Sequence, residues 1–182
     1  MQIYLHSYLP KTCICNYRLQ LSICMRYCGN IADAEDVLHD GFIKVIRNID
    51  SFRDRGPGSL EGWMKRIMVN TALNFIRDHS RTKKLFEPET SFEHLLIDVE
   101  DRNYFEVLAE KVDSKYLMEL ICELPPGYRT VFNMYVFESY SHKEIAHTLS
   151  CSENTSKSQL SKARQWLRNK LNEHLSKQES LQ

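Results

Sequence analysis

The feature that most restricts the fold is a pair of helical patterns joined by a tight turn near the C-terminal end of this 182-residue sequence. Ser141 precedes a short helical pattern, and Glu144 follows three residues later, which is the spacing of a capping box. The turn Ser150-Cys151-Ser152 then leads into a longer helical pattern over 153–173, which Ser152 can cap. A short helix, a tight turn and a longer helix predict a helix-turn-helix unit.

The second helix of this pattern has a polar and basic side that suits a DNA groove. Apolar residues recur from Leu160 to Leu171 at helical spacing, so the other side is expected to face outward. No acidic residue lies between Asn154 and Asn172. Amides and hydroxyls pair with base edges, and cationic groups pair with phosphates. The residues expected to contact DNA are Asn154, Thr155, Lys157, Ser158, Gln159, Ser161, Lys162 and Arg164.

Helical periodicity continues through most of the chain. Apolar residues recur at helical spacing over 16–28, over 32–49 and from Ser59 to about Arg81. The spacing in the first stretch is that of Leu19, Ile23 and Tyr27, and the residues expected on one face of the second are Val37, Leu38, Phe42, Val45, Ile46 and Ile49. Further helices are expected over 114–122 and 127–138. The chain contains only 6 Gly and 5 Pro, which is sparse for a many-turned β-sandwich or barrel. The sequence therefore predicts an all-α protein built from two small helical domains.

Charge divides the sequence into three blocks, although the whole chain has a net charge of zero. Residues 1–84 carry a net charge of +5, residues 85–113 carry −7, and residues 114–182 carry +2. We expect two domains, 1–84 and 114–182, joined by an acidic linker over 85–113 with a short helix near 101–110. Two basic domains suggest a polyanionic partner, but ordinary surface charge with a solvated linker gives the same pattern.

The helix that begins at Ser59 combines an apolar stripe with a side rich in arginine and asparagine. Trp63 and Phe75 fall on the apolar stripe, so core packing is favoured over base stacking for both. On the other side, polar residues recur at three- and four-residue intervals, a spacing that can follow phosphates and offer amides to bases. The residues expected to contact DNA are Lys65, Arg66, Asn70, Asn74, Arg77 and Arg81.

Acidic residues follow one side of the preceding helix. Asp33, Asp36 and Asp40 recur along this side, and Lys44 comes one turn later. Two explanations remain open from spacing alone. The stripe is either a surface for a basic protein partner or a result of the preference of carboxylates for the positive start of a helix.

Neither the cysteines nor the histidines form a pattern typical of a metal or catalytic site. Four of the six cysteines lie in the first 28 residues, but their spacing matches no common zinc site. Cys24 and Cys28 lie one helical turn apart in an apolar stretch, so we expect buried free thiols. His39, His142 and Cys151 form no recognisable nucleophile–base arrangement. We therefore predict no enzymatic activity, no cofactor and no metal.

The sequence also shows no pattern typical of membrane insertion or secretion. No stretch approaches the roughly 18 uninterrupted apolar residues of a membrane span. The N-terminus lacks a charged region followed by a clean apolar run, so no secretory signal is expected. These patterns predict a cytoplasmic protein without membrane insertion.

Several motifs occur in a fixed order along the two predicted domains. They include Asp33-Ala-Glu-Asp-Val-Leu-His-Asp40, the stretch 58–74, Leu124-Pro-Pro-Gly127, Tyr140-Ser-His-Lys-Glu-Ile-Ala146 and Thr155-Ser-Lys-Ser-Gln-Leu-Ser-Lys-Ala-Arg164. In residues, order and spacing, the chain resembles the extracytoplasmic-function (ECF) sigma factors over about residues 20–81 and 114–172.

The resemblance implies a factor that lends promoter specificity to core RNA polymerase, which itself carries out the chemistry. The first domain resembles sigma region 2, and its contacts with the β′ clamp helices would be Asp33, Glu35, Asp36, Asp40 and Lys44. The loop Arg53–Ser59 and the helix after it would face the −10 element. The second domain resembles region 4, in which helix 153–168 would read the −35 element and the domain would also touch the β flap.

The family further implies promoter DNA and an anti-sigma factor as partners, and no small-molecule substrate. Two alternatives remain: a sigma mimic that sequesters an anti-sigma factor without binding DNA, and a simple helix-turn-helix regulator. The basic faces argue against a mimic, and the first domain is unexplained by a simple regulator. The chain departs from the family at His39, where Gln is frequent, at Ser150, where many helix-turn-helix proteins have Gly, and in its first 20 or so residues.

Overall fold

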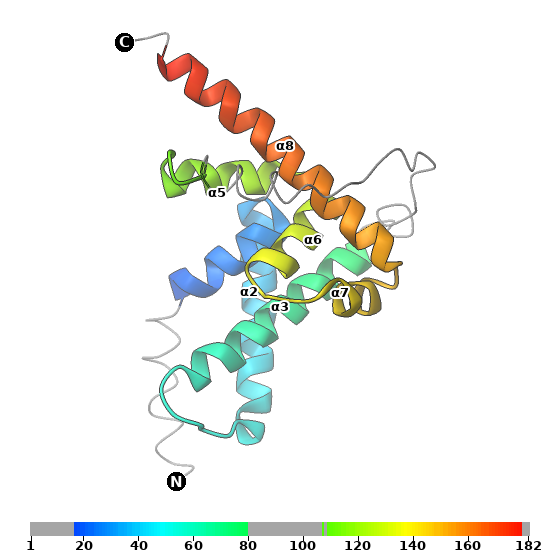
Figure 1. Cartoon of the computed structure of the whole chain (residues 1–182). Helices are drawn as coiled ribbons and strands as arrows, with labels where there is room; N and C mark the ends of the chain where they lie inside the picture. The colour runs from blue at the N-terminus through cyan, green and yellow to red at the C-terminus, as the bar shows by residue number, and fades with distance from the viewer. Residues whose placement is uncertain (1–16, 80–106, 108, 180–182) are drawn as a thin grey trace. The chain divides into compact units, whose positions relative to one another are not determined.

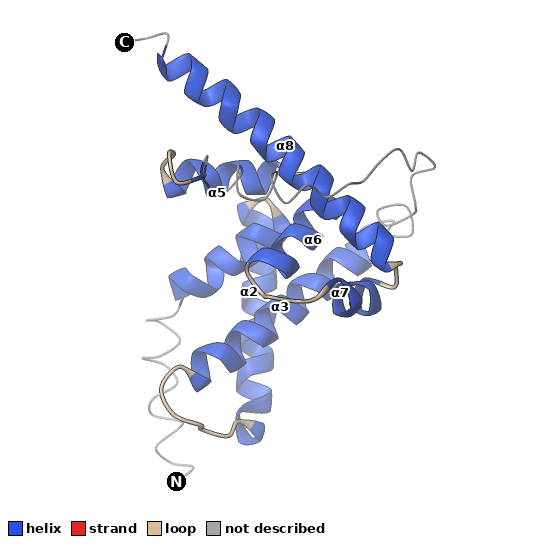
Figure 2. Cartoon of the chain, in the orientation of Figure 1, coloured by secondary structure: helices blue, strands red, loops and turns tan. Residues whose placement is uncertain are grey.

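Apolar residues at helical spacing form helices in both halves of the chain. The structure is a computed structural model that describes residues 17–79, 107 and 109–179. All regular structure in these residues is helical, as predicted, and they contain no β-strand (Figure 2). The chain divides into two compact units, residues 1–80 and 81–182.

In the described part of the first unit, residues 17–28 are helical, and this helix ends at Gly29, which has a φ of 79°. Helix α2 (Ile31–Asn48) follows, and a short 3-10 turn, η1 (Ile49–Ser51), extends it. The Oδ1 atom of Asn30 accepts a hydrogen bond from the Asp33 N–H at 2.9 Å, so Asn30 caps α2. A loop then leads to α3 (Ser59–His79) (Figure 1).

Helices α2 and α3 pack against each other at close range (Figure 1). Gly41 makes this approach possible, because a Cβ at that position would collide with the Met68 sulfur. The Lys44 ammonium donates a hydrogen bond to Thr71 Oγ1 at 3.2 Å, which adds a polar contact between the two helices. The buried apolar residues of the pair are Ala34, Val37, Leu38, Val45, Met64, Met68, Val69, Ala72 and Leu73.

Two apolar residues do not lie where helical spacing predicts. Leu19 was expected on an inner face, but 51% of its surface is exposed. Ile46 was expected beside Val45 in the core, but it is 56% exposed because the buried side of α2 is centred on Val37, Leu38 and Val45. The predicted apolar face of α2 was therefore too wide.

The second unit contains α5 (Ser114–Glu123), α6 (Pro126–Val136), α7 (His142–Leu149) and α8 (Glu153–Glu179) (Figure 1). Helix α8 continues about six residues beyond the expected end near 173. Helices α6 and α7 both pack against its first half. The expected inner residues of α8, from Leu160 to Leu171, form part of the core.

Side chains cap the starts of both helices of the helix-turn-helix, as predicted. Ser141 Oγ accepts from the Glu144 N–H, and a Glu144 carboxylate oxygen accepts from the Ser141 N–H at 2.8 Å, which completes the capping box. Ser150 ends α7 in a left-handed conformation with a φ of 54°. Ser152 Oγ accepts from the Thr155 N–H at 2.9 Å and caps α8.

A buried arginine ties α6 to the end of α5. Arg129 is 8% exposed, and its Nη1 donates to the carbonyl of Cys122 at 2.6 Å and to that of Leu124 at 3.2 Å. These carbonyls lie at the end of α5, where backbone acceptors lack partners within the helix. The side chain therefore fixes the turn that contains Pro125 and Pro126.

Several predictions fall outside the described residues. They concern the first 16 residues with Cys13 and Cys15, Arg81, and nearly all of the acidic segment 85–113. In the described part of the chain, no helix combines the length and apolar character needed to cross a membrane.

Candidate nucleic-acid and protein interfaces

The arginine and asparagine side of α3 is exposed. Arg66, Asn70, Asn74 and Arg77 all face solvent, spaced so that they form one row along the helix. Arg77 Nη2 donates a hydrogen bond to Asn74 Oδ1 at 3.0 Å, so two residues of the row are held together. Lys65 lies beside the row and is half-buried. The row therefore presents cations and amides along one exposed side of α3.

The loop before α3 is braced by one carboxylate that sequence reasoning missed. Asp54 Oδ1 accepts from the Gly56 N–H and from Ser59 Oγ, each at 2.9 Å. These hydrogen bonds, the Gly56 one foremost, lower the pKa of Asp54. An Asp followed two residues later by a Gly is a turn signal that could have revealed this role. Ser59 is the first residue of α3, as expected, and its hydroxyl holds the loop through the hydrogen bond to Asp54.

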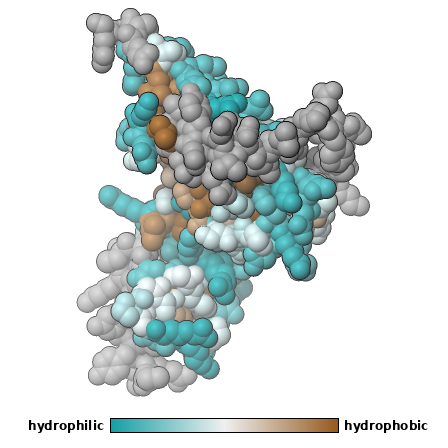
Figure 3. All heavy atoms as spheres, in the orientation of Figure 1, coloured by the Kyte–Doolittle hydropathy of each residue, from teal (hydrophilic) through white to brown (hydrophobic). Residues whose placement is uncertain are grey.

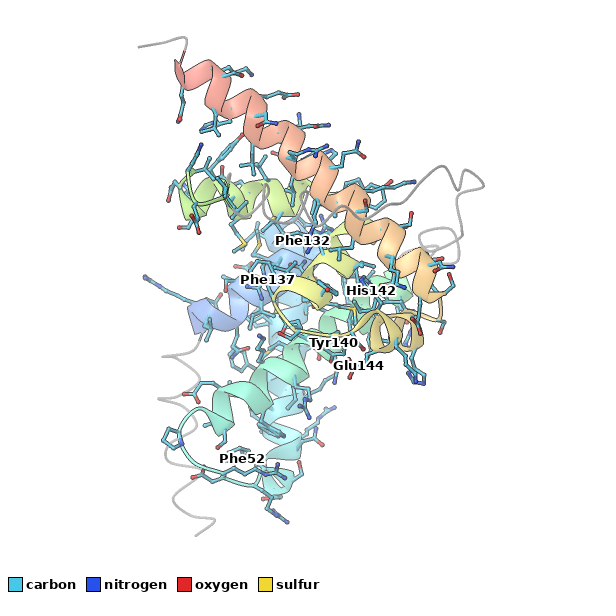
Figure 4. The ribbon with its side chains drawn as sticks, viewed as in Figure 1. Phe52, Phe132, Phe137, Tyr140, His142 and Glu144 are labelled. Atoms are coloured by element: carbon cyan, nitrogen blue, oxygen red, sulfur yellow. The ribbon has the colours of Figure 1, made fainter. Side chains whose placement is uncertain are left out.

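Two aromatic rings close the base of this loop. Phe52, labelled in Figure 4, lies 5.4 Å from Trp63 between ring centroids, at an interplanar angle of 52°. Both rings are half-buried, as is Phe75 further along α3. Trp63 therefore packs against Phe52, in line with the packing role expected from its place on the apolar stripe.

The acidic residues of α2 divide into two groups. Asp33 is half-buried, and its Oδ2 accepts from the Asn30 side-chain amide at 2.7 Å, which fits a role at the helix start. Glu35, Asp36 and Asp40 are exposed on the helix surface. Lys44, which comes one turn after Asp40, is half-buried and is turned toward Thr71 of α3.

Apolar residues that sequence reasoning missed continue this stripe. Ile43 is 45% exposed, and Ile46 lies within the same outward side of α2. Residue 43 comes three positions after Asp40, so a helical projection could have placed it beside the carboxylate. Together, Asp36, Asp40, Ile43 and Ile46 form a surface with acidic and apolar parts, which we call the α2 stripe. Such a surface suits a protein partner with basic and apolar groups.

The start of α8 presents a narrower outward side than expected. Asn154 is exposed, and Lys157, Ser158, Ser161 and Lys162 are half-buried. The expected positions of Thr155 and Gln159 were wrong, because these side chains are only 7% and 8% exposed. Thr155 Oγ1 lies 2.9 Å from Ser152 Oγ, inside the turn, so its hydroxyl serves the cap of α8.

Helix α7 explains why the buried side of α8 is wide at this point. Ser156 has no exposed surface, and its Oγ lies 2.9 Å from His142 Nδ1. Arg164, two turns further along α8, is half-buried with its guanidinium 5.8 Å from the centroid of the Tyr135 ring. The visible surface around α7 and the start of α8 is predominantly hydrophilic (Figure 3).

The described cysteines form no disulfide and are free thiols. Cys24 and Cys28 are buried, and burial raises the pKa of Cys24 to about 12. Burial also raises the pKa of Cys151. Among the described residues, no group of three or more His, Cys, Asp or Glu side chains is arranged to hold a metal ion. The thiol of Cys24 is therefore protonated and unreactive at neutral pH.

Two family models match the sequence, one in each unit. The model for Sigma-70 region 2 matches residues 14–82, and the model for Sigma-70 region 4 matches residues 114–167. The first match contains α2, the braced loop and α3. The second contains the helix-turn-helix with the first half of α8.

Several sigma factors are similar to this chain over most of its length. It is 31% identical over 146 residues to the ECF RNA polymerase sigma-E factor of Haemophilus influenzae, which covers 76% of this chain and 75% of that protein. It is 30% identical over 159 residues to the ECF RNA polymerase sigma factor SigW of Bacillus subtilis, covering 82% and 81%.

A third relative is longer. The ECF RNA polymerase sigma factor SigE of Mycolicibacterium smegmatis is 31% identical over 151 residues, which cover 83% of this chain and 56% of that protein. The chain thus spans little more than half the length of this relative.

Proposed function

Because the chain belongs to the ECF sigma factors of RNA polymerase, we propose that it binds core RNA polymerase in the cytoplasm and directs it to promoters. Core polymerase carries out the chemistry, and this chain acts as a non-enzymatic initiation factor. The observation that carries the proposal is the presence of two polar helix faces in one chain. One is the exposed row on α3, and the other is the basic side of the α8 helix-turn-helix.

The α2 stripe is the proposed contact with the β′ clamp helices. Exposed carboxylates of Asp36 and Asp40 attract a basic partner, and burial of Ile43 and Ile46 against that partner would supply apolar affinity. Glu35 is exposed and stays in the proposed contact set. Asp33 and Lys44 would act indirectly, by holding the start of α2 and its contact with α3.

The braced loop and the α3 row are the proposed contacts with the −10 element. Opening DNA costs a few kcal/mol for each unstacked base step. A loop that is already ordered by Asp54 can receive an unstacked base with little further loss of conformational entropy. Arg66, Asn70, Asn74 and Arg77 would then hold the opened strand through phosphates and base edges.

The −35 element is assigned to α8. Asn154, Lys157, Ser158, Ser161 and Lys162 are the side chains that remain available on its first turns. Thr155 and Gln159 would act indirectly, by shaping the start of the helix. Arg164 would act from its position over the Tyr135 ring. The second unit, which matches region 4, would also contact the β flap of the polymerase.

The acidic segment is proposed to connect these two contacts on polymerase. Residues 85–113 carry a net charge of −7, which is compatible with a path that is otherwise used by RNA. Each unit alone carries only a modest positive charge, so DNA binding by the free chain should be weak. Polymerase would hold both units over one promoter and raise their effective concentration. An anti-sigma factor is a further proposed partner.

Binding to core polymerase tests the role of the α2 stripe. The paired change Asp36→Lys and Asp40→Lys should weaken binding to purified core at least about tenfold, since it reverses charge at the contact. Glu119→Lys is the matched control, because Glu119 is an exposed acid on α5. Equal affinity of the double variant and the wild type would exclude the α2 stripe as the polymerase contact.

Promoter binding by the assembled polymerase tests the role of α8. Lys157→Ala with Lys162→Ala should remove the dependence of binding on the −35 sequence while leaving core binding unchanged. Lys115→Ala, on the exposed surface of α5, is the control for loss of a lysine. A wild-type chain that binds core but never confers DNA binding would instead favour a sigma mimic.

A further inference from the structure

The first half of α8 is held at two points by a single cluster of side chains from α6 and from the two helices of the helix-turn-helix, α7 and α8. Tyr135 lies on α6, His142 is the first residue of α7, and Ser156 and Arg164 lie on α8. We call these four residues the aromatic cluster. His142 is labelled in Figure 4.

The contacts of the cluster form a continuous path. His142 Nδ1 lies 2.9 Å from Ser156 Oγ, within hydrogen-bonding distance. The His142 ring stacks on Tyr135 with centroids 4.7 Å apart and an interplanar angle of 24°. The Arg164 guanidinium lies 5.8 Å from the same Tyr135 ring, in a cation–π arrangement. The path therefore leaves α8 at Ser156 and returns to it at Arg164.

The two anchor points lie far enough apart to fix the direction of the helix. Ser156 and Arg164 are eight residues apart, which corresponds to about 12 Å along an α-helix. The apolar packing of Leu160 and Ala163 already holds α8 against its neighbours, and two further contacts separated along its axis restrain its angle to α6 and α7. A recognition helix must present several side chains to base edges at once, so its angle affects all of them together.

We propose that Tyr135 and His142 are positioning residues that set the angle of α8 in the DNA groove and so determine discrimination of the −35 sequence. The proposal rests on the proposed function of α8 as the −35 reader. Ser156 cannot contact DNA itself, because it has no exposed surface. Arg164 is half-buried and contacts the Tyr135 ring of the cluster. Its replacement should therefore reduce discrimination of the −35 sequence by changing the angle of α8.

The test compares two promoters that differ only in an intact or scrambled −35 element, bound by the full chain with core polymerase. Tyr135→Leu should reduce the affinity ratio between the promoters about tenfold, the size of one lost base contact. Tyr135→Phe keeps the ring and should restore the wild-type ratio. Arg164→Gln should lower the ratio in the wild type, but much less in the Tyr135→Leu background, because the two residues are coupled.

A second stacked tyrosine provides the matched control. Tyr116 on α5 stacks on His174 of α8 with centroids 4.0 Å apart, beyond the first half of the helix. Tyr116→Leu should lower thermal stability, as Tyr135→Leu does, but leave the affinity ratio unchanged. If Tyr135→Leu does not fold, His142→Asn removes the stacked ring while keeping a polar group at the helix start, and the same loss of discrimination is expected.

The outcomes separate this inference from the proposed function. If the wild type does not distinguish the two promoters, α8 is not the −35 reader and both proposals fail. If the wild type discriminates and Lys157→Ala weakens binding, but folded Tyr135→Leu or His142→Asn keeps the full ratio, the positioning role alone is overturned. An equal loss of ratio in Tyr116→Leu would also overturn it, since any destabilisation would then have the same effect.

Discussion

Ser150 adopts a left-handed backbone conformation at the end of α7, with a φ of 54°. This conformation costs an L-residue about 1–2 kcal/mol, and glycine avoids the cost. Ser150→Gly should therefore stabilise the second unit by about 1 kcal/mol, less the extra entropy that glycine has in the unfolded chain. The midpoint of urea unfolding, followed by circular dichroism, measures the effect.

Ser176→Gly is the control for this prediction. Ser176 lies in the last turn of α8, where its Oγ donates to the Asn172 carbonyl at 2.9 Å and where glycine is a poorer helix former than serine. The same substitution should therefore lower stability there. A lower midpoint in Ser150→Gly than in the wild type would contradict the conformation of the turn.

The capping box of α7 makes the stability of the second unit depend on pH. Hydrogen bonds from Ser141 Oγ and the Ser141 N–H lower the pKa of Glu144 below its usual 4.5 in the folded chain. Because the folded pKa is the lower one, this contribution is full above about pH 4.5 and is lost as the pH falls through the folded value. Glu144→Gln should flatten that loss in urea titrations from pH 7 to below pH 4. An unchanged acid dependence in Glu144→Gln would show that the box does not cause it.

Local sequence rules predicted the side chains that act on their own backbone. Ser141, Glu144 and Ser152 take the capping roles expected from their spacing, because such contacts need only residues three positions apart. Lys44 and Gln159 could not be placed in this way. Lys44 turns toward Thr71 of another helix, and Gln159 is buried at the broadened side of α8.

At the scale of the elements, the close approach of α2 to α3 depends on Gly41. A Cβ at this position would collide with the Met68 side chain. Gly41→Ala should destabilise the first unit by up to about 2 kcal/mol, because the cost of overfilling a packed core, about 1–3 kcal/mol, is offset in part by roughly 1 kcal/mol of helix propensity. In a Met68→Ala background, Gly41→Ala should lower the free energy of unfolding less than it does in the wild type, because the colliding Met68 atoms are then absent.

Gly62 is the matched glycine for this experiment. It lies in α3, and a Cβ added there would meet no neighbouring side chain within 4 Å, so Gly62→Ala should raise stability through helix propensity. The midpoints of thermal unfolding of Gly41→Ala and Gly62→Ala measure the two effects. Equal effects of the two substitutions would mean that α2 and α3 do not meet at Gly41.

The joint between α5 and α6 depends on Arg129. Its Nη1 serves two carbonyls at the end of α5 and is buried with them. Arg129→Met should cost roughly 1.5–3 kcal/mol, since the charged donor is lost and buried acceptors remain. Lys143→Met, at an exposed position of α7, should change stability little in the same denaturant series. Comparable losses in both variants would contradict the role of Arg129 as a tie between helices.

Helix starts were easier to predict than helix ends and faces. The starts of α7 and α8 follow from capping residues, and both were placed correctly. The end of α8 near Glu179 was missed because no glycine or proline follows residue 173. The exposure of Ile46 was missed because the width of a buried face depends on which helix packs against it, and a periodic pattern does not contain that information.

At the scale of the whole molecule, composition and motif order predicted an all-α chain with sigma regions 2 and 4. Both regions are present in the family matches, in the expected order. The order of the motifs predicts the two regions because each motif occupies a fixed place in its helical unit. The surface roles are less accessible to sequence reasoning, since the apolar part of the α2 stripe and the aromatic cluster arise only when helices pack.

The central claim is that this chain gives core polymerase a promoter specificity through both units. Run-off transcription with purified core polymerase and genomic DNA fragments, with and without the chain, tests it most directly. Mapped 5′ ends should reveal discrete new starts that share −35 and −10 motifs, and these starts should disappear with Lys157→Ala and Lys162→Ala although core binding is retained. No new starts together with no binding to core would contradict the account.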